Sequence, residues 1–243
     1  MTEFKQKRAL VTGGSGDLGS AICKELAGAG FLVIVHAGRN IQAAEAVAAE
    51  IIQSGGIAET ISFDVTDADE CRQVLQGLID DQPIQVLVNN AGIHNDAPLA
   101  GMSHAQWQKV IDVNLQGFFN VCQPLIMPMA RTRWGRVIGV SSVAARGNRG
   151  QANYAAAKAG LEAAVRSLSL EMASRGITAN CVAPGVIESR MTEAAFDKAF
   201  IRQHIPVRRM GRLEEVAALV SFLASEQAGY ITGQTIAIDG GMR

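Results

Sequence analysis

The sequence has few cysteines, few charged residues and no long apolar segment, and each shortage excludes a class of protein. Its 243 residues include four cysteines, which are widely scattered and form no Cys-x-x-Cys pair, so a disulfide framework is not expected. The four histidines show no ligand spacing either, and we expect no metal site. The longest uncharged stretch, residues 113–130, contains two prolines and four side-chain amides, which makes it a poor membrane span.

The near-equal numbers of acidic and basic residues also exclude a class of protein. Lys and Arg number 22 and Asp and Glu number 23, for a net charge of −1, which argues against a protein driven by neutralisation of nucleic-acid phosphates. Charged residues are 19% and hydrophobic residues 48% of the chain, a composition that predicts extensive buried surface, subunit interfaces included. Four of the first eight residues are charged and the apolar run after them is short. We therefore expect no secretory signal and a cytoplasmic location.

Short apolar, β-branched runs alternate with longer amphipathic segments along the chain. The runs show no in/out alternation, which is the pattern of strands buried on both faces of a parallel sheet. We therefore expect one doubly wound α/β domain over residues 1–243, with a mostly or wholly parallel seven-stranded sheet and a ligand beyond the carboxyl ends of the strands. Strands are expected at residues 9–12, 32–35, 59–62, 85–88, 136–140, 178–183 and 235–238, and helices at 18–29, 41–53, 68–80 and 153–174.

A glycine-rich turn follows the first expected strand. Glycines there let the backbone approach a phosphate, and the N-terminus of the next helix supplies N–H donors. Asp17 lies in the same turn and would either cap that helix or repel a phosphate. The turn predicts a dinucleotide site, whose expected contacts are Gly13, Gly14, Ser15, Gly16, Leu18 and Gly19.

Tyr154 and Lys158 begin the long helix expected at residues 153–174. Residues four apart share one helix face, so both side chains point into one groove. A phenol has a pKa near ~10 and is a poor acid at neutral pH, but a nearby ammonium and a cationic nicotinamide ring favour the phenolate. We expect Tyr154 to have a lowered pKa and to protonate a carbonyl oxygen as a hydride arrives.

These motifs resemble those of the short-chain dehydrogenase/reductase family. The segment from Thr12-Gly13 to Gly19 is similar to the family's Thr-Gly-x-x-x-Gly-x-Gly, with Asp17 at the second family glycine, and Tyr154-x-x-x-Lys158 matches the family's catalytic pair. The resemblance covers residues 8–242 and is strongest to the 3-oxoacyl-[acyl-carrier-protein] reductases, through residues 147–160, 230–235 and 239–242. It implies a Rossmann-type oxidoreductase.

The resemblance also implies the cofactor and its contacts. The acidic residue that accepts the ribose hydroxyls of NAD falls on Ala37, whereas Arg39 is placed to pair with a 2′-phosphate, which favours NADPH. The adenine contact falls on Asp64 and Val65. The remaining implied contacts are Asn89, Ala91, Gly92, Tyr154, Lys158, Pro184, Gly185, Ile187 and Ser189, with a purely structural role for Asn89 as the alternative.

Two further catalytic residues follow from the same resemblance. A serine at the end of the fifth strand orients the substrate carbonyl: counting along the strand selects Ser142, whereas counting back from Tyr154 selects Ser141. We prefer Ser142, because strand register fixes side-chain direction more firmly than loop length does. Asn114 matches the family asparagine that bends the fourth helix and holds a water linking Lys158 to solvent, although an asparagine within a helix can instead bond only to the backbone.

The resemblance extends to partners. It implies a substrate lid near residues 189–212, a homotetramer, and recognition of an acidic acyl carrier protein by two arginines beside the active-site mouth. Those arginines fall on Arg133 and Arg175, and solvated surface arginines are the alternative.

The sequence thus predicts an NADPH-dependent reductase of 3-oxoacyl thioesters that acts on acyl carrier protein. One alternative keeps the chemistry and changes the substrate to a small alcohol or sugar alcohol. A second alternative is a cofactor-binding scaffold or regulatory subunit without activity, which the altered glycine turn and the short loop after the serines would favour.

Overall fold

The computed structural model describes residues 6–189 and 197–242. Seven strands form one parallel sheet in the order β3-β2-β1-β4-β5-β6-β7, which confirms the doubly wound architecture. The strands are β1 (Arg8–Val11), β2 (Leu32–Ala37), β3 (Ile57–Ser62), β4 (Val86–Asn89), β5 (Gly135–Val140), β6 (Ile177–Pro184) and β7 (Thr235–Ile238).

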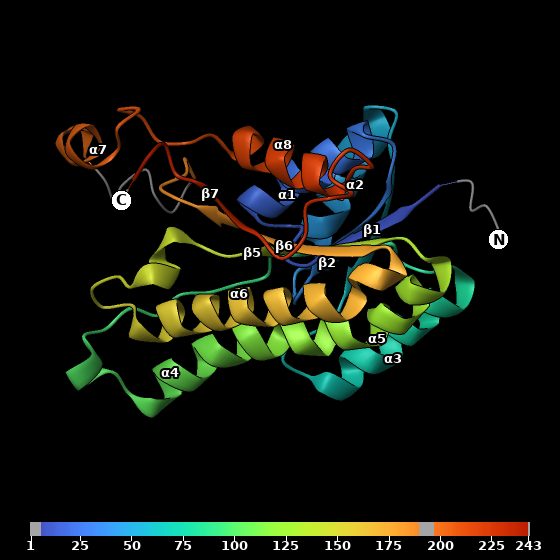
Figure 1. The fold of residues 1–243 in the computed structure, drawn as a ribbon, viewed down its shortest axis with the longest axis horizontal. Helices are drawn as coiled ribbons and strands as arrows, with labels where there is room; N and C mark the ends of the chain where they lie inside the picture. Colours follow the sequence, from blue (N-terminus) through green and yellow to red (C-terminus); the bar gives the residue numbers. More distant parts are fainter. Residues whose placement is uncertain (1–5, 190–196, 243) are drawn as a thin grey trace.

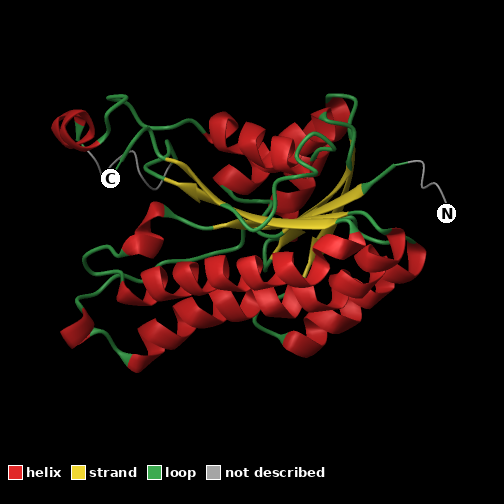
Figure 2. Cartoon of the chain, in the orientation of Figure 1, coloured by secondary structure: helices red, strands yellow, loops and turns green. Residues whose placement is uncertain are grey.

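Helices cover both faces of the sheet (Figures 1 and 2). One layer contains α1 (Asp17–Gly28), α2 (Ile41–Gln53) and α8 (Leu213–Ala224). The other contains α3 (Ala68–Asp81), α4 (His104–Ile111), α5 (Gly117–Thr132) and α6 (Ala152–Met172). The short α7 (Lys198–His204) lies apart from both layers, at the left of the view.

The packing explains why the strands lack in/out alternation. Ala9 and Val11 of β1 belong to the apolar cluster under α1, α2 and α8, whereas Leu10 belongs to the cluster under α3, α5 and α6. All three side chains are fully buried. Both faces of the central strands are therefore core, and each strand reads as a continuous apolar run.

The start of α1 differs from one of the two expectations for Asp17. The N-cap is Gly16, and Asp17 is the first helical residue. The reason is the tightness of the turn: the Gly16 N–H donates to the Gly13 carbonyl, and the Gly16 carbonyl already accepts from Ser20. Asp17 therefore does not cap this helix, and the N-cap residue has no side chain that could cover the helix N-terminus.

The expectations for cysteines, metal ligands and membrane spans can be compared with the described residues. The four cysteines are buried and unpaired, and burial raises the pKa of Cys71, Cys122 and Cys181 to about 12, so these thiols are unreactive packing groups. Within residues 6–189 and 197–242, no cluster of His, Cys, Asp and Glu could hold a metal ion. No helix of that part of the chain is long and apolar enough to span a membrane.

Candidate active site

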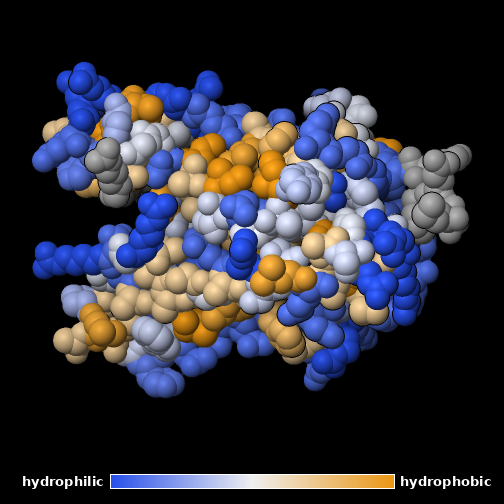
Figure 3. All heavy atoms as spheres, viewed as in Figure 1, coloured by the Kyte–Doolittle hydropathy of each residue, from blue (hydrophilic) through white to orange (hydrophobic). Residues whose placement is uncertain are grey.

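A cleft of about 390 Å³ lies at the carboxyl ends of the central strands. Figure 3 shows the molecule hollowed at this end, between the part that carries α7 and the part that carries α4 and α6. The cleft brings together seven of the residues predicted from the sequence. Its lining is Leu18, Asn90, Gly92, Ile93, His94, Val140, Ser141, Ser142, Tyr154, Lys158, Pro184 and Gly185.

The glycine turn is held by the segment that follows β4. The Thr12 hydroxyl accepts from the backbone N–H groups of Asn90 and Ala91, both at 3.0 Å. The Asn90 amide donates back to the carbonyls of Thr12 and Gly13, at 3.0 and 3.1 Å. Gly19 must lack a side chain, since a Cβ there would lie 2.1 Å from the Gly13 oxygen. The turn and the β4 end thus form one rigid wall of the cleft.

This wall fits a dinucleotide phosphate. Gly16 makes no side-chain cap to the first turn of α1, so the helix N-terminus presents its N–H groups and positive dipole end toward the cleft. The Asp17 carboxylate is the opposing feature, because it adds negative charge to the same turn. Gly13 has φ +62° and Gly19 has no space for a Cβ, so the backbone of this turn has the close-packed form that a pyrophosphate would fit.

The predicted adenine side lies at the ends of β2 and β3, away from the cleft lining. Arg39 is 92% exposed, and its Nη2 lies 3.9 Å from Asp64 Oδ2. Hydrogen bonds from the backbone and hydroxyl of Thr66 hold the pKa of Asp64 below its usual value, with a smaller contribution from Arg39. Val65 is buried and its carbonyl accepts from Asn120 at 2.9 Å, so Val65 packs rather than presents a polar group.

Asn89 does not line the cleft. It ends β4 with its side chain buried, and its Nδ2 has no hydrogen-bond partner among the described residues. Its neighbours Asn90 and Gly92 line the cleft instead. The geometry therefore agrees with the structural alternative for Asn89.

The two candidate serines point to different partners. The Ser141 hydroxyl is buried and donates to the Glu162 carboxylate of α6 at 2.5 Å. Ser142 lines the cleft beside Tyr154 and interacts with its phenol, and the Ser142 oxygen accepts from the Ala144 N–H at 3.1 Å. Only Ser142 is engaged with the tyrosine, which agrees with the preference from strand register.

Tyr154 differs from expectation in its acidity. Burial raises the pKa of Tyr154, the interaction with the Ser142 hydroxyl opposes this rise, and the charge of Asp96 adds to it. The lowered pKa expected from the sequence is therefore not produced by the protein alone. The Lys158 ammonium lies over the Tyr154 ring, 5.5 Å from its centre.

Lys158 is held at the bottom of the cleft. It is 3% exposed, and its Nζ donates to the Val140 carbonyl at 2.7 Å. Burial lowers the pKa of Lys158 to about 8, and the nearby Cys181 raises it slightly. Near neutral pH this amine can therefore both hold and release a proton, which an exposed lysine cannot do.

Asn114 lies in a π-helical turn, residues Asp112–Gln116, between α4 and α5. Its Nδ2 donates to the carbonyls of Ile93 and Val110, at 2.8 and 2.9 Å. Its Oδ1 is buried and has no partner among the described residues. A Cβ built on Gly92 would lie 2.6 Å from this oxygen and 3.3 Å from Lys158 Nζ, so both groups face the same small space beside Gly92.

The predicted nicotinamide side and lid follow β6. Pro184 and Gly185 line the cleft, and Ile187 pairs with Gly211 in an isolated parallel bridge. The Glu188 N–H donates to the Gly211 carbonyl at 2.8 Å, so the two ends of the lid segment are joined at its base. Ser189 is half-buried, and residues 190–196 of the expected lid lie outside the described residues.

Arg133 and Arg175 are not beside this chain's own cleft. Tyr154 lies in the first turn of α6, whereas Arg175 follows its last turn, and the 21 residues of the helix span roughly 30 Å. Arg133 ends α5 at the same far end and donates to the Ser174 carbonyl. The expected position at the active-site mouth is therefore wrong for a single chain, because the resemblance gave position in the sequence and not position in space.

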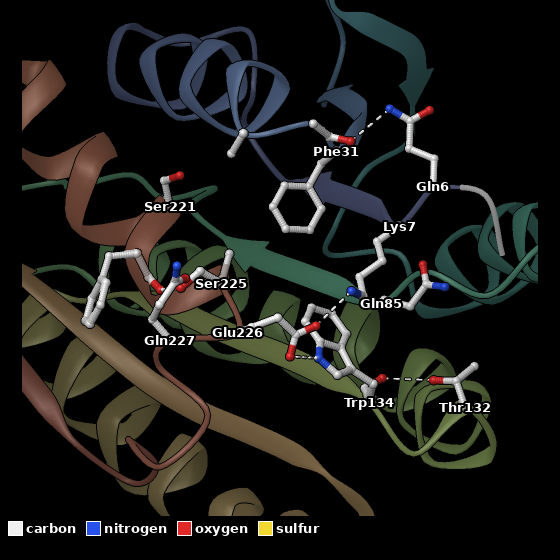
Figure 4. A pocket seen from close by; sticks show the side chains of 14 residues that line it. Gln6, Lys7, Phe31, Gln85, Thr132, Trp134, Ser221, Ser225, Glu226 and Gln227 are labelled. Carbon is white, nitrogen blue, oxygen red and sulfur yellow. Dashed lines mark hydrogen bonds and ion pairs between the residues drawn. The ribbon is translucent and has the colours of Figure 1, made fainter. Parts of the chain in front are cut away.

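A larger cavity, about 960 Å³, lies at the amino ends of the strands (Figure 4). Glu226 accepts from Lys7 and from the Trp134 indole there, both at 2.9 Å. Lys7 and Arg136 lie over the Trp134 ring, at 4.4 and 4.2 Å from its centre. These charges satisfy one another, and the cluster ties the starts of β1 and β5 to the end of α8. We interpret it as structural.

Sequence reasoning did not select Ile93, His94 or Val140, which line the cleft, and it also missed a buried residue that supports Tyr154 from behind. Asn153 is fully buried at the start of α6. Its Nδ2 donates to the carbonyls of Asn95 and Gln106, and its Oδ1 accepts from the Tyr154 N–H at 2.8 Å. It anchors the turn that carries Tyr154. An asparagine directly before the tyrosine was the available signal, but nothing in the spacing showed its partners.

Comparison with known proteins gives consistent results. A family model described as enoyl-(acyl carrier protein) reductase matches residues 15–243. A 3-oxoacyl-[acyl-carrier-protein] reductase of Synechocystis is 45% identical over 100% of this chain and 99% of that protein. Nodulation protein G of Rhizobium is 43% identical over 100% and 99%.

A solved structure is similar throughout. A protein of Agrobacterium tumefaciens, assigned as a gluconate dehydrogenase, superposes with a TM-score of 0.94 and 31% identity over 97% of this chain and 95% of that one. With the fold, the Tyr154-x-x-x-Lys158 pair and these full-length relatives, the chain belongs to the short-chain dehydrogenase/reductase family, whose members are oxidoreductases that use NAD(P).

Proposed function

We propose that the chain is an NADPH-dependent reductase that converts a 3-oxoacyl thioester, carried by acyl carrier protein, to the 3-hydroxyacyl thioester. The observation that carries this proposal is that Ser142, Tyr154 and Lys158 line one cleft, where Ser142 interacts with the Tyr154 phenol. The relatives named 3-oxoacyl-[acyl-carrier-protein] reductase support the substrate class.

The reaction adds a hydride to the C3 carbonyl carbon and a proton to its oxygen. Bound NADPH supplies the hydride. Ser142 donates a hydrogen bond to the carbonyl oxygen and so aligns it with the Tyr154 hydroxyl. Tyr154 then transfers its proton to that oxygen as negative charge develops on it. The carbonyl becomes a neutral alcohol, and Tyr154 is left as the phenolate.

The buried groups behind Tyr154 return the proton. Lys158, with a pKa of about 8, releases a proton toward the phenolate and lies near the unpartnered Asn114 oxygen. A water between Asn114 Oδ1 and Lys158 Nζ would satisfy both and lead toward solvent. Asn114 is in this proposal the relay residue, and the π-helical turn is what aims it.

The cofactor contacts are proposed on the same basis. Gly13, Gly14, Ser15, Gly16, Leu18 and Gly19 would hold the pyrophosphate. Asp64 and Val65 would flank the adenine, while Ala91, Gly92, Pro184, Gly185, Ile187 and Ser189 would border the nicotinamide half. Arg39 is exposed and only 3.9 Å from Asp64, so its guanidinium can turn to a 2′-phosphate, which favours NADPH over NADH.

Assembly would bring the carrier-binding arginines to an active site. The α5–α6 surface exposes Phe119, Met127 and Leu170 around an apolar groove of about 400 Å³, a surface that a second copy would cover. If two copies pack with antiparallel α6 helices, Arg133 and Arg175 of one lie at the end of the other that carries Tyr154. We propose a homotetramer in which carrier recognition crosses this interface.

A second function is favoured by one observation. The gluconate dehydrogenase assignment of a structure that superposes at a TM-score of 0.94 supports oxidation of a sugar acid or other small alcohol by the same residues. An inactive scaffold is the remaining alternative, and Asp17 in the glycine turn is the feature that favours it.

One assay separates these functions. NADPH oxidation is followed with an acetoacetyl thioester, free and carrier-bound, with NADH as the cofactor control and an enoyl thioester as the substrate control. Oxidation of NADPH by the 3-oxoacyl thioester, faster on the carrier, is the expected result. Oxidation of gluconate or another alcohol without thioester reduction would support the second function, and inactivity with every substrate would support the scaffold.

A further inference from the structure

A buried histidine joins the two segments that border the dinucleotide site. His36 is the penultimate residue of β2, directly before Ala37, and is 1% exposed. Its Nδ1 accepts from the Gly13 N–H at 3.0 Å, and its Nε2 lies 2.9 Å from the Phe63 carbonyl oxygen. One imidazole therefore contacts both the glycine turn after β1 and the residue that precedes Asp64 and Val65.

These two contacts fix the tautomer of the ring. The Phe63 carbonyl can only accept, so Nε2 carries the proton and donates it. Nδ1 then has the free lone pair that the Gly13 N–H requires. The ring also packs against Phe63, with 4.2 Å between ring centres. Only the neutral ring with its proton on Nε2 satisfies both neighbours.

The position of Gly13 gives this contact its importance. The paired register of β1 and β2 ends at Val11 and Val35, and Gly13 then takes a left-handed conformation with φ +62°. Its N–H is bonded to the His36 side chain and not to the β2 backbone. The imidazole thus replaces a backbone acceptor at the point where the chain leaves the sheet to form the turn.

We propose that His36 is a positioning residue of the dinucleotide site, which sets the separation between the glycine turn and the Asp64–Val65 segment. The inference rests on the dinucleotide binding of the proposed function, but not on its substrate. His36 touches no cofactor atom in this account. It acts through the Gly13 N–H and the Phe63 carbonyl.

Protonation of this ring has a defined effect. Burial lowers the pKa of His36, and the hydrogen bond with Phe63 and the carboxylates of Asp64 and Glu70 oppose that shift. Arg39 is paired with Asp64 at 3.9 Å. The ring is neutral at neutral pH, and acid converts Nδ1 from an acceptor into a donor that faces the Gly13 N–H. Acidification should therefore loosen the turn.

The test uses substitutions that keep one ring nitrogen's role at a time. An asparagine carbonyl can occupy the place of Nδ1 and accept from Gly13, whereas a glutamine amide reaches the place of Nε2 and donates to Phe63. The dissociation constants of NADPH and NADH are measured by fluorescence for wild type, His36→Asn and His36→Gln. His104→Gln, on the exposed start of α4, is the control for histidine loss.

We expect His104→Gln to bind within about threefold of wild type. His36→Asn keeps the Gly13 contact and loses the Phe63 contact, so it should bind more weakly than wild type but more tightly than His36→Gln. His36→Gln leaves the half-buried Gly13 N–H without this acceptor, and its dissociation constant should rise about tenfold. The wild-type constant should rise more steeply than that of His36→Asn as the pH falls. Protonation of the nucleotide, Asp64 and Glu70 affects wild type and His36→Asn alike. The difference between the pH profiles of their dissociation constants therefore reports on His36.

Equal binding by His36→Asn and His36→Gln, or identical pH profiles for wild type and His36→Asn, would overturn the inference. If His36→Gln does not fold, the wild-type ring decides: ¹⁵N chemical shifts should show an unprotonated Nδ1 and a protonated Nε2, and the opposite tautomer would refute the proposal. Intact dinucleotide binding without thioester reduction would contradict the proposed substrate alone. No dinucleotide binding by wild type would contradict both.

Discussion

The two adjacent serines at the end of β5 provide a sharp test of the cleft, because the same chemical change at each should give opposite outcomes. Ser142→Ala removes the hydroxyl that interacts with the Tyr154 phenol. Loss of one donor to the developing oxyanion costs about 2.7–4 kcal/mol. We expect kcat for thioester reduction to fall about 10²- to 10³-fold, with the unfolding free energy nearly unchanged.

Ser141→Ala should show the reverse. The Ser141 hydroxyl is buried and donates at 2.5 Å to Glu162, which is half-buried and retains access to water. A hydrogen bond to a charged group contributes about 1.5–3 kcal/mol, and the remaining solvation of Glu162 reduces the expected loss of stability to roughly 1–2 kcal/mol. Activity should stay within about threefold of wild type, since Ser141 does not touch Tyr154.

Steady-state kinetics and urea unfolding of both variants measure these quantities. The two substitutions lie on neighbouring residues and delete the same atom, so each is the control for the other. A large loss of kcat in Ser141→Ala with an active Ser142→Ala would refute the assignment. It would mean that the loop length before Tyr154, and not the strand register, decides which serine meets the substrate.

Four further outcomes are expected. Arg39→Ala should raise the KM for NADPH about 10- to 100-fold and leave the KM for NADH unchanged, since one charge-assisted contact to phosphate is lost; equal effects on both cofactors would exclude a 2′-phosphate contact. Glu226→Gln should lower the unfolding free energy by about 0.5–1 kcal/mol and leave kcat unchanged, because the cluster around Trp134 is structural and half-exposed. A loss of kcat would show that the larger cavity is functional. Burial lowers the pKa of Lys158 to about 8 in the folded state, below that of a lysine in the unfolded chain, so the folded state releases this proton first. Wild-type stability relative to Lys158→Met should therefore increase as the pH rises from 7.5 to 9 and be constant below 7, and urea unfolding of both proteins checks the sign. Phe119→Lys with Met127→Lys should convert the assembly to a smaller species in sedimentation, and an unchanged mass would place the interface elsewhere.

The sequence predicted the fold closely because its signals are local. The expected helix at residues 41–53 and strand at 235–238 coincide with α2 and β7, and the other strands differ by one or two residues at their ends. Continuous apolar runs imply burial on both faces, and strand–helix alternation then leaves few topologies. The position of the cleft followed from the same logic, since it lies at the carboxyl ends of the strands. The family resemblance, and not the strand pattern, selected Gly92, Ser142, Pro184 and Gly185.

The misses share a physical cause, which is dependence on three-dimensional neighbours. Whether Gly16 or Asp17 caps α1 depends on where the Gly13 carbonyl lies. The direction of the Tyr154 pKa depends on how much protein surrounds the ring. Arg133 and Arg175 lie at the same end of α6, but the length of α6 separates them from Tyr154, and no residue spacing shows which end of a helix faces a substrate.

The role of His36 also depends on three-dimensional neighbours that the sequence does not show. Its residue type and spacing matched no ligand pattern, so the sequence marked it as unremarkable. Its role depends on Gly13 and Phe63, which are 23 and 27 residues away along the chain and meet only when β1, β2 and β3 pair.

The central claim is that Tyr154 donates the proton in a reduction for which the rest of the cleft only binds and aligns. Tyr154→Phe removes one oxygen from a half-buried ring and should leave the packing intact. The most direct measurement is a single-turnover reduction of an acetoacetyl thioester by NADPH-loaded Tyr154→Phe, together with the NADPH dissociation constant of the same variant. The account predicts that the reduction is abolished and that NADPH binding is within about threefold of wild type. Retained turnover, with NADPH binding intact, would contradict it.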